Sequence, residues 1–191
     1  MNGWWAASYV VLWILVLVLC ALVVALARQI GTLHLRLGPR GALEMDDEGP
    51  ALGEAPPEIE AIDLDGNAHS VGGPGADRLI MFVSPGCLVC GQVLPSLPAV
   101  AATNDLEAIV VSDVDRHETA RAFASKRVAT PVLAGPEMTQ LYEVPGTPYL
   151  VVLDEAGIVR AKGTVNNLEQ IEGLVTTAKR RAHEPVHREV M

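Results

Sequence analysis

The chain has 191 residues, a length that suits one domain with a short appendage; 50% of them are hydrophobic, and the formal net charge at pH 7 is −9. An acidic chain repels the phosphates of nucleic acids, so we expect no nucleic acid partner. Its three cysteines are too few for a small scaffold that disulfides hold together.

The N-terminal segment is apolar over a length that matches a bilayer. Residues 1–27 contain no charged side chain. At about 1.5 Å per residue, a helix from Trp4 to Ala27 would cross a hydrocarbon core of roughly 30 Å. Trp4 and Trp5 stand where interfacial anchors are expected, and Arg28 closes the segment. We therefore predict a transmembrane anchor at 1–27.

A cleaved signal peptide is the alternative for this segment, because Ala25-Leu26-Ala27 offers a small-x-small cleavage site. Signal peptides, however, start with a basic region and have an apolar core of about 7–15 residues. Residues 1–3 carry no lysine or arginine, and the apolar run is longer. We expect a retained signal-anchor and a single-pass protein of the cell membrane. Cys20 lies inside the run, where we expect an inert thiol.

The rest of the chain divides into a linker, a domain and a tail. Residues 28–57 contain the acidic cluster Glu44 to Glu48 and several Gly-Pro and Pro-Pro pairs. This composition buries little and is typical of an extended or mobile linker. Regular turn signals mark a folded domain at 58–178, and residues 179–191 form a polar tail.

Short apolar runs and helical spacings alternate within the domain. We expect strands where runs of strand length stand between turn residues, namely at Ile59 to Leu64, His69 to Val71, Leu79 to Val83, Ala108 to Val111, Val132-Leu133, Tyr149 to Leu153 and Ile158 to Ala161. We expect helices from Cys87 onward and at Glu118 to Arg127, Glu137 to Tyr142 and Asn167 to Ala178. This order predicts an α/β sandwich with a mixed central sheet.

The pair Cys87 and Cys90 opens the helix that follows the strand Leu79 to Val83. A helix N-terminus presents free N–H groups and the positive end of the dipole, which both favour a thiolate. We therefore expect Cys87 to be the nucleophile and Cys90 to resolve the mixed disulfide. Asp63 and Asp113 stand at strand ends, where either could accept the Cys90 proton, but we expect surface turn residues.

Prolines surround this candidate site in the sequence. Pro95 lies inside the predicted helix and should kink it, and Pro98 either extends the kink or ends the helix. The alternative is that both prolines merely end a short helix. Gly146-Thr147-Pro148 directly precedes the strand Tyr149 to Leu153. A proline is tolerated there because no ladder donor is needed, and a cis bond before it has a modest cost.

A CxxC motif at a helix start, a proline five residues later, and Val-Pro-Gly-Thr-Pro-Tyr before a strand hairpin resemble the thioredoxin superfamily. The resemblance implies a thioredoxin-like sandwich with a mixed central sheet, preceded here by the transmembrane helix. It implies that Pro148 is cis and faces the cysteines, and that Thr147 offers its backbone to the substrate. It also implies that Cys87 attacks and Cys90 resolves.

A narrower resemblance is to MauD, a family of thioredoxin-like accessory proteins of methylamine utilisation. It rests on the apolar anchor, Arg28 to Gly31, Leu35 to Leu43 and Ala161 to Glu169, and it covers most of the chain. It implies a membrane-anchored oxidoreductase that acts on protein thiols and disulfides in the maturation of methylamine dehydrogenase. The small subunit of that enzyme, which holds many disulfides, and a further redox partner are the expected partners.

Two departures from the thioredoxin pattern concern the residues beside the cysteines. Gly86 replaces the usual tryptophan before the first cysteine, and Leu88-Val89 replaces the usual Gly-Pro dipeptide. Because this dipeptide tunes the redox potential, the sequence leaves open whether the chain reduces, oxidises or isomerises disulfides.

The side of the membrane on which the domain lies is predicted differently by charge and by resemblance. Arg28, Arg36 and Arg40 follow the anchor and no basic residue precedes it, which would place the domain in the cytoplasm. The MauD resemblance implies the opposite side. Because the positive-inside rule has exceptions, we expect an extracytoplasmic, periplasmic domain.

Two other functions compete with disulfide exchange. A peroxiredoxin-like peroxidase would need a Pro-x-x-x-Thr-x-x-Cys lead, but residues 80–86 read Ile-Met-Phe-Val-Ser-Pro-Gly. A redox-inert binding module would use the groove at Pro148 alone, and the intact cysteine pair argues against it.

Zinc binding is the chemical alternative for the CxxC motif. His183 and His187 have finger-like spacing, but they lie too far from Cys90 for a compact site. We interpret His69 and His117 as exposed loop residues. We therefore expect no metal and no cofactor.

Overall fold

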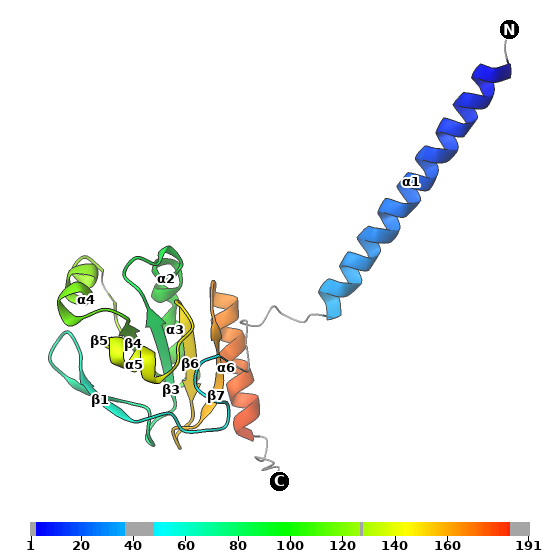
Figure 1. Ribbon diagram of the computed structural model, residues 1–191. Coiled ribbons are helices and arrows are strands. Elements are labelled where there is room, and N and C mark those ends of the chain that lie inside the picture. Colours follow the sequence, from blue (N-terminus) through cyan, green and yellow to red (C-terminus); the bar gives the residue numbers. More distant parts are fainter. Residues whose placement is uncertain (1–2, 37–47, 127, 184–191) are drawn as a thin grey trace. The chain divides into compact units, whose positions relative to one another are not determined.

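The computed structural model describes residues 3–36, 48–126 and 128–183. The chain separates into two compact units, Met1–Pro39 and Arg40–Met191. Figure 1 shows the helix of the first unit and the layered sheet of the second.

The first unit is built on one long helix, α1 (Gly3–Arg36). Its part Gly3–Val23 is long and apolar enough to cross a membrane, judged by length and composition. The helix continues through Arg36 rather than ending at Arg28, because no proline interrupts residues 28–36. The first residues of the predicted linker are therefore helical.

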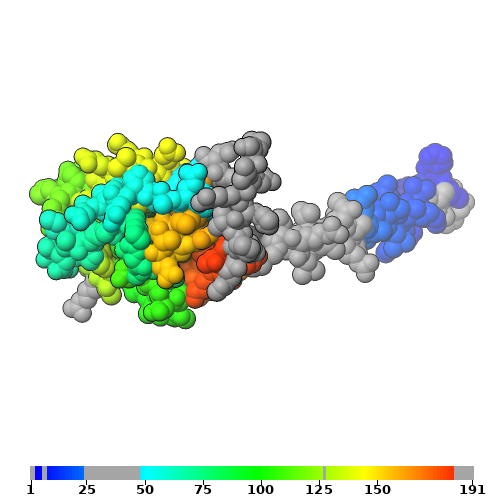
Figure 2. Space-filling view, turned by 90° about the horizontal axis from the view of Figure 1, so that it is seen from below, coloured from blue at the N-terminus to red at the C-terminus, as the bar shows by residue number. Residues whose placement is uncertain are grey.

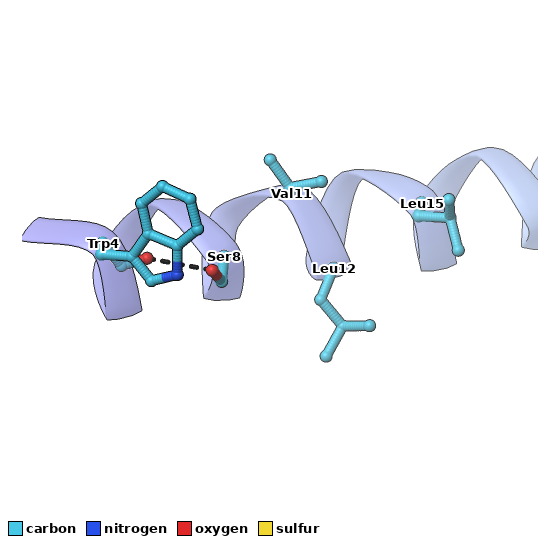
Figure 3. A pocket seen from close by; sticks show the side chains of 5 residues that line it. All are labelled: Trp4, Ser8, Val11, Leu12 and Leu15. Carbon is cyan, nitrogen blue, oxygen red and sulfur yellow. Dashed lines mark hydrogen bonds between the residues drawn. The ribbon is translucent and has the colours of Figure 1, made fainter.

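Side chains along α1 follow the spacing of one helix turn. Figure 3 shows Trp4, Ser8, Val11, Leu12 and Leu15 around a shallow hollow on the helix surface, where the Ser8 hydroxyl donates to the Trp4 carbonyl at 3.0 Å. Cys20 is a free, exposed cysteine on this helix.

The second unit has a five-stranded sheet in the order β5-β4-β3-β6-β7. Its strands are β3 (Arg78–Val83), β4 (Glu107–Ser112), β5 (Val132–Ala134), β6 (Tyr149–Leu153) and β7 (Val159–Thr164). β3 pairs in parallel with β4 and antiparallel with β6, so the predicted mixed sheet is confirmed. All residues of β3 are buried, as expected for a central strand with both faces covered.

A hairpin of β1 (Ile59–Ile62) and β2 (Ala68–Val71) forms a separate two-stranded sheet. β1 ends earlier than the predicted Leu64, because the carboxylate of Asp63 begins the turn by accepting the backbone N–H of Asn67 at 2.8 Å. Asp63 then forms an isolated bridge with Leu133, which brings the hairpin to the β5 edge of the larger sheet.

Helices cover both faces of the larger sheet. α2 (Leu88–Val93), the 3-10 helix η1 (Leu94–Ser96) and α3 (Leu97–Asn104) follow one another, so Pro95 changes the helix type and the chain stays helical past both prolines. These segments share a core cluster with α6 (Leu168–His183), whereas α5 (Pro136–Leu141) packs on the other face (Figure 1).

The helix α4 (Arg116–Phe123) starts two residues before the predicted Glu118. Asp115 is its N-cap, and the Asp115 carboxylate accepts the Glu118 N–H at 2.9 Å. An acidic or hydroxyl residue three positions before a glutamate is a known start signal that fixes this boundary. The helix also ends at Phe123, short of Arg127, which lies outside the described residues.

Residues 48–57, which we call the strap, lie on the domain instead of leaving it as a linker. The Gly53 N–H donates to the Val159 carbonyl at 2.9 Å, and the Val159 N–H donates to the Glu54 backbone carbonyl at 2.9 Å. Leu52 packs against the core cluster on the α5 face. Figure 2 shows this part of the chain, in cyan, beside the orange β7 region. The strap thus covers the outer edge of the sheet at the start of β7.

Candidate active site

The cysteine pair stands where β3 passes into α2. The turn after β3 is closed by the Cys87 N–H, which donates to the Ser84 carbonyl at 3.1 Å. Cys87 is the N-cap of α2, and its Sγ accepts the Cys90 N–H at 3.1 Å. A hydrogen bond of this kind favours the charged form of a sulfur atom.

Cys87 and Cys90 form a disulfide, with their Cα atoms 5.3 Å apart. The two sulfurs differ in access. Cys90 is 4% exposed and belongs to the core cluster beside α2, α3 and α6, whereas Cys87 is half-buried. An incoming partner can therefore reach Cys87, and Cys90 is shielded behind it.

The loop before β6 faces the accessible sulfur. The Thr147 carbonyl oxygen lies 3.6 Å from Cys87 Sγ, and the Thr147–Pro148 peptide bond is cis. β6 runs antiparallel to β3 with Tyr149 opposite Phe82, so the first residue of β6 lies beside the last residues of β3. The pairing register thus brings together residues that are about sixty positions apart in sequence.

The chain segment that carries the disulfide is uncharged. Residues 79–104 contain no charged side chain, although the whole chain carries 19% charged residues. Within this stretch Leu88 is 86% exposed directly beside Cys87. A large apolar side chain in that position suits a contact with a protein partner rather than with water.

The described contacts of Cys87 Sγ also bear on the peroxidase alternative. Besides the disulfide bond, its polar contacts are the Cys90 N–H and the Thr147 carbonyl. Neither is the arginine or threonine side chain that a peroxidatic cysteine would need.

Among the residues that the structure describes, no group of three or more His, Cys, Asp or Glu could hold a metal ion.

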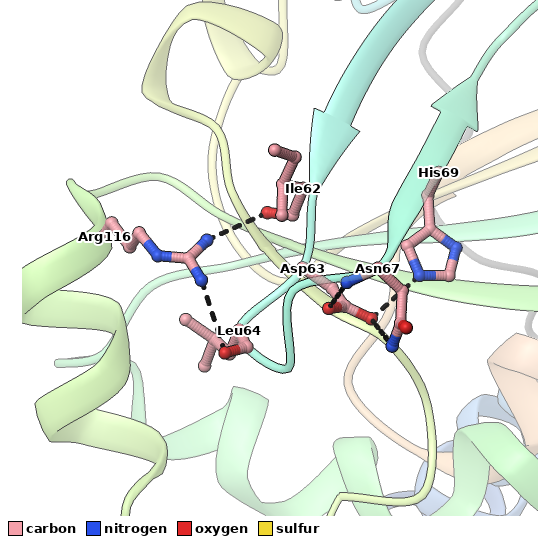
Figure 4. A network of polar contacts seen from close by, with 6 residues as sticks. All are labelled: Ile62, Asp63, Leu64, Asn67, His69 and Arg116. Carbon is pink, nitrogen blue, oxygen red and sulfur yellow. Dashed lines mark hydrogen bonds and ion pairs between the residues drawn. The ribbon is translucent and has the colours of Figure 1, made fainter.

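Asp63 is not the surface turn residue that the sequence suggested. It is 2% exposed, and His69 Nε2 lies 2.8 Å from its Oδ2, as Figure 4 shows. Burial alone would raise the pKa of Asp63, but the hydrogen bonds from Asn67 and His69 outweigh it and lower the pKa to about 2. Arg116 donates to the neighbouring carbonyls of Ile62 and Leu64. This network holds the hairpin in place and does not contact Cys90.

Acid should therefore weaken the fold through Asp63. Its pKa is about 2 in the folded protein and about 3.9 in an unfolded chain, so the unfolded state binds more protons between these values. The stability that Asp63 contributes is complete above about pH 5 and is lost as the pH falls from about 4 towards 2. Urea unfolding at about pH 6 and pH 3 should show a larger loss for the native chain than for Asp63→Asn. Equal losses would contradict this assignment.

Asp113 remains the other carboxylate near the site. Its N–H donates to the Val83 carbonyl at 3.0 Å, which places it beside the end of β3. Its Oδ1 is buried and has no hydrogen-bond partner among the described residues. No described contact joins it to Cys90, so the role of proton acceptor remains an untested alternative to the predicted surface turn residue.

The histidines are placed differently from the sequence interpretation. His69 lies in β2, in agreement with the predicted strand from His69 to Val71, but it is half-buried and its Nε2 lies 2.8 Å from Asp63 Oδ2. His117 is exposed as expected, but on α4. His187 lies outside the described residues, and of His183 only the backbone is described, at the end of α6.

Known proteins resemble this chain over almost its full length. A methylamine utilization protein MauD from Methylobacillus flagellatus is 36% identical over 182 residues, which cover 93% of this chain and 88% of that protein. One from Methylorubrum extorquens is 33% identical over 177 residues, covering 91% and 86%. The chain belongs to the MauD family. No protein-family model matches the chain.

Solved structures confirm the thioredoxin-like fold. A Chlorobium tepidum protein assigned as the thiol:disulfide interchange protein DsbE has a TM-score of 0.59 at 17% identity, covering 69% of this chain and 98% of its own. The thioredoxin domain of a Bacteroides vulgatus thiol-disulfide oxidoreductase has a TM-score of 0.53 at 23% identity, covering 68% and 96%. On this fold, the MauD-family chain carries a disulfide-forming CxxC at the start of α2.

Proposed function

We propose that this MauD-family chain exchanges disulfides with proteins through Cys87 as the attacking sulfur, with Thr147 and Pro148 shaping the substrate site. The observation that supports this most directly is the Cys87–Cys90 disulfide with only Cys87 accessible, 3.6 Å from the Thr147 carbonyl. That carbonyl belongs to a loop whose backbone an extended substrate segment can contact from the same side as the sulfur.

The reaction balances over two thiol exchanges. The reduced Cys87 thiolate attacks a substrate disulfide, forms a mixed disulfide and releases one substrate thiolate. The Cys90 thiolate then attacks Cys87 Sγ, which releases the second substrate thiolate and leaves the Cys87–Cys90 disulfide. Two electrons have moved from the chain to the substrate. The same steps in reverse deliver a disulfide to a substrate, and a further redox partner restores the starting form in either case.

The substrate that we propose is the disulfide-rich small subunit of methylamine dehydrogenase. Its support is the family, since the relatives are named methylamine utilization proteins. The exposed Leu88, in a segment without charged side chains, suits a partly folded polypeptide, which exposes apolar segments.

We further propose that α1 anchors the chain in the membrane with the domain outside the cytoplasm, where structural disulfides persist. An alkaline phosphatase fused to the C-terminus should then be active, and an inactive fusion would place the domain inside.

A trapping experiment tests the proposed substrate. Cys90→Ser removes the resolving sulfur, so the mixed disulfide on Cys87 should persist in host cells grown on methylamine. Non-reducing gels followed by mass spectrometry should identify the methylamine dehydrogenase small subunit in the adduct. The double variant Cys87→Ser, Cys90→Ser is the control and should capture nothing. Adducts with other proteins alone would reject this substrate while leaving the exchange chemistry intact.

A further inference from the structure

The strap is held most tightly at its first described residue, by two buried side chains of the sheet. The Glu48 carbonyl accepts two hydrogen bonds, one from the Lys162 ammonium at 2.7 Å and one from the Tyr149 hydroxyl at 3.0 Å. Lys162 is 0% exposed and Tyr149 is 2% exposed. Burying a lysine and a tyrosine hydroxyl is costly unless they are hydrogen-bonded, so these contacts fix residue 48 firmly on the domain.

The other end of the strap is held by a second tyrosine. The Tyr142 hydroxyl donates to the Pro57 carbonyl at 3.3 Å, and its ring contacts Phe82 with centroids 5.4 Å apart. Burial raises the pKa of Tyr142 far above its usual range, so the hydroxyl keeps its proton and remains a donor. The strap is therefore attached at both ends and, through Val159, in the middle.

Only one of these attachments adjoins the active site. Tyr149 is the first residue of β6 and directly follows the loop residues Thr147 and Pro148. The carbonyl oxygen of Thr147 lies 3.6 Å from Cys87 Sγ. Gly49 packs against the Tyr149 ring so closely that an added Cβ would overlap the hydroxyl. The position of the strap therefore limits where Tyr149 can lie, and Tyr149 limits where the loop at 147–148 can lie.

We propose that the strap positions the substrate loop, with Tyr149, Lys162 and Gly49 as positioning residues for exchange with protein substrates. This inference rests on the proposed function. A protein substrate must lay its backbone against the Thr147–Pro148 loop while its disulfide meets Cys87, whereas a small disulfide needs Cys87 alone. Loosening the strap where it contacts Tyr149 should therefore slow protein substrates more than small ones, because small misplacements of a binding group slow an oriented reaction steeply.

The test compares two glycines of the strap whose substitution strains the backbone in the same way. Gly49 and Gly53 both have positive φ, +73° and +78°, so an alanine strains the backbone at either position. At Gly53 the added Cβ meets open space, whereas at Gly49 it meets Tyr149. Gly49→Ala against Gly53→Ala thus isolates the contact with Tyr149. Tyr149→Phe against Tyr142→Phe makes the same comparison for the two tyrosine hydroxyls, without added bulk.

The full chain in detergent micelles, reduced beforehand, would be mixed in single turnovers with insulin as a protein disulfide and with Ellman's reagent as a small one. The ratio of the two rates should fall about fivefold in Gly49→Ala and Tyr149→Phe, the size of one lost hydrogen bond. It should stay within about twofold of the native ratio in Gly53→Ala and Tyr142→Phe. The inference would be overturned if Tyr149→Phe kept the native ratio of rates, or if the ratio fell equally in Gly49→Ala and Gly53→Ala. A native chain that reduces neither reagent would instead overturn the proposed function.

Discussion

Replacing Cys87 with serine should abolish thiol–disulfide exchange, lowering the rate with any disulfide by at least about a thousandfold. Cys87 carries the accessible sulfur, and Cys90 is buried in the core cluster, so no second thiol of the domain can take over the attack. Cys90→Ser should behave differently. It keeps the first attack and forms one mixed disulfide, but it lacks turnover. Stopped-flow mixing with a small disulfide separates the two, because it records the first attack alone.

Cys20 provides the matched control for these substitutions. It is the remaining cysteine of the chain and lies on α1, in a different compact unit from the CxxC pair. Cys20→Ala should leave both the first attack and turnover within about twofold of the native rates. If Cys87→Ser retained the first attack and Cys90→Ser lost it, the roles of the two sulfurs would be reversed. If all three variants kept native rates, the CxxC would have no part in the reaction.

The sequence predicted the central sheet and the cysteine pair because the relevant signals are local. The runs at residues 79–83 and 149–153 are continuous and apolar. Such a run is enough to predict a strand that is buried on both faces. The CxxC follows a strand within four residues, so its place at a helix start could be read from the turn residues between them. The approach of Thr147 to Cys87 was expected only from family resemblance, since the register of β3 and β6 is not visible in composition.

The strap was missed because its contacts are non-local and involve backbone atoms. Residues 48–57 have the glycine and proline content of a linker, and a backbone carbonyl such as that of Glu48 has no signature in a sequence. Its partners Tyr149 and Lys162 lie more than a hundred residues away. Lysine is also seldom fully buried, so β7 gave no reason to expect it in the core. In contrast, the Asp115 cap of α4 was a readable signal that the helix prediction overlooked.

The burial of Asp63 shows a different limit of the sequence. An aspartate in an Asp-x-Asp-Gly-Asn turn normally faces water. Here a histidine from the next strand covers it, and Asn67 satisfies its remaining oxygen. Cross-strand pairs of this kind depend on the hairpin register, in which Ala61 stands opposite His69. The acidic turn residue and its histidine could be named from the sequence, but their contact could not.

Phe82→Ala should be among the most destabilising substitutions in the domain, lowering the free energy of unfolding by about 3–5 kcal/mol. Phe82 is 0% exposed in the central strand, stands opposite Tyr149 and contacts the ring of Tyr142. Removing its ring leaves a cavity beneath both tyrosines that bind the strap, and close-packed surroundings relax only partly into such a space. Circular dichroism during urea unfolding measures the loss. All three tryptophans lie on α1, so tryptophan fluorescence would not report on the domain.

Leu88→Ala is the matched comparison, since it also truncates a large apolar side chain within six residues of Phe82. Leu88 is 86% exposed, so the same truncation should change the free energy of unfolding by less than about 0.5 kcal/mol. It should instead slow exchange with protein substrates, because the segment beside Cys87 loses an exposed apolar side chain that a partner can contact. Equal destabilisation by both variants would mean that Leu88 packs inside the domain and is not available to a partner. The contrast between the two residues thus tests whether one short segment supports the sheet with one apolar side chain and meets the substrate with another.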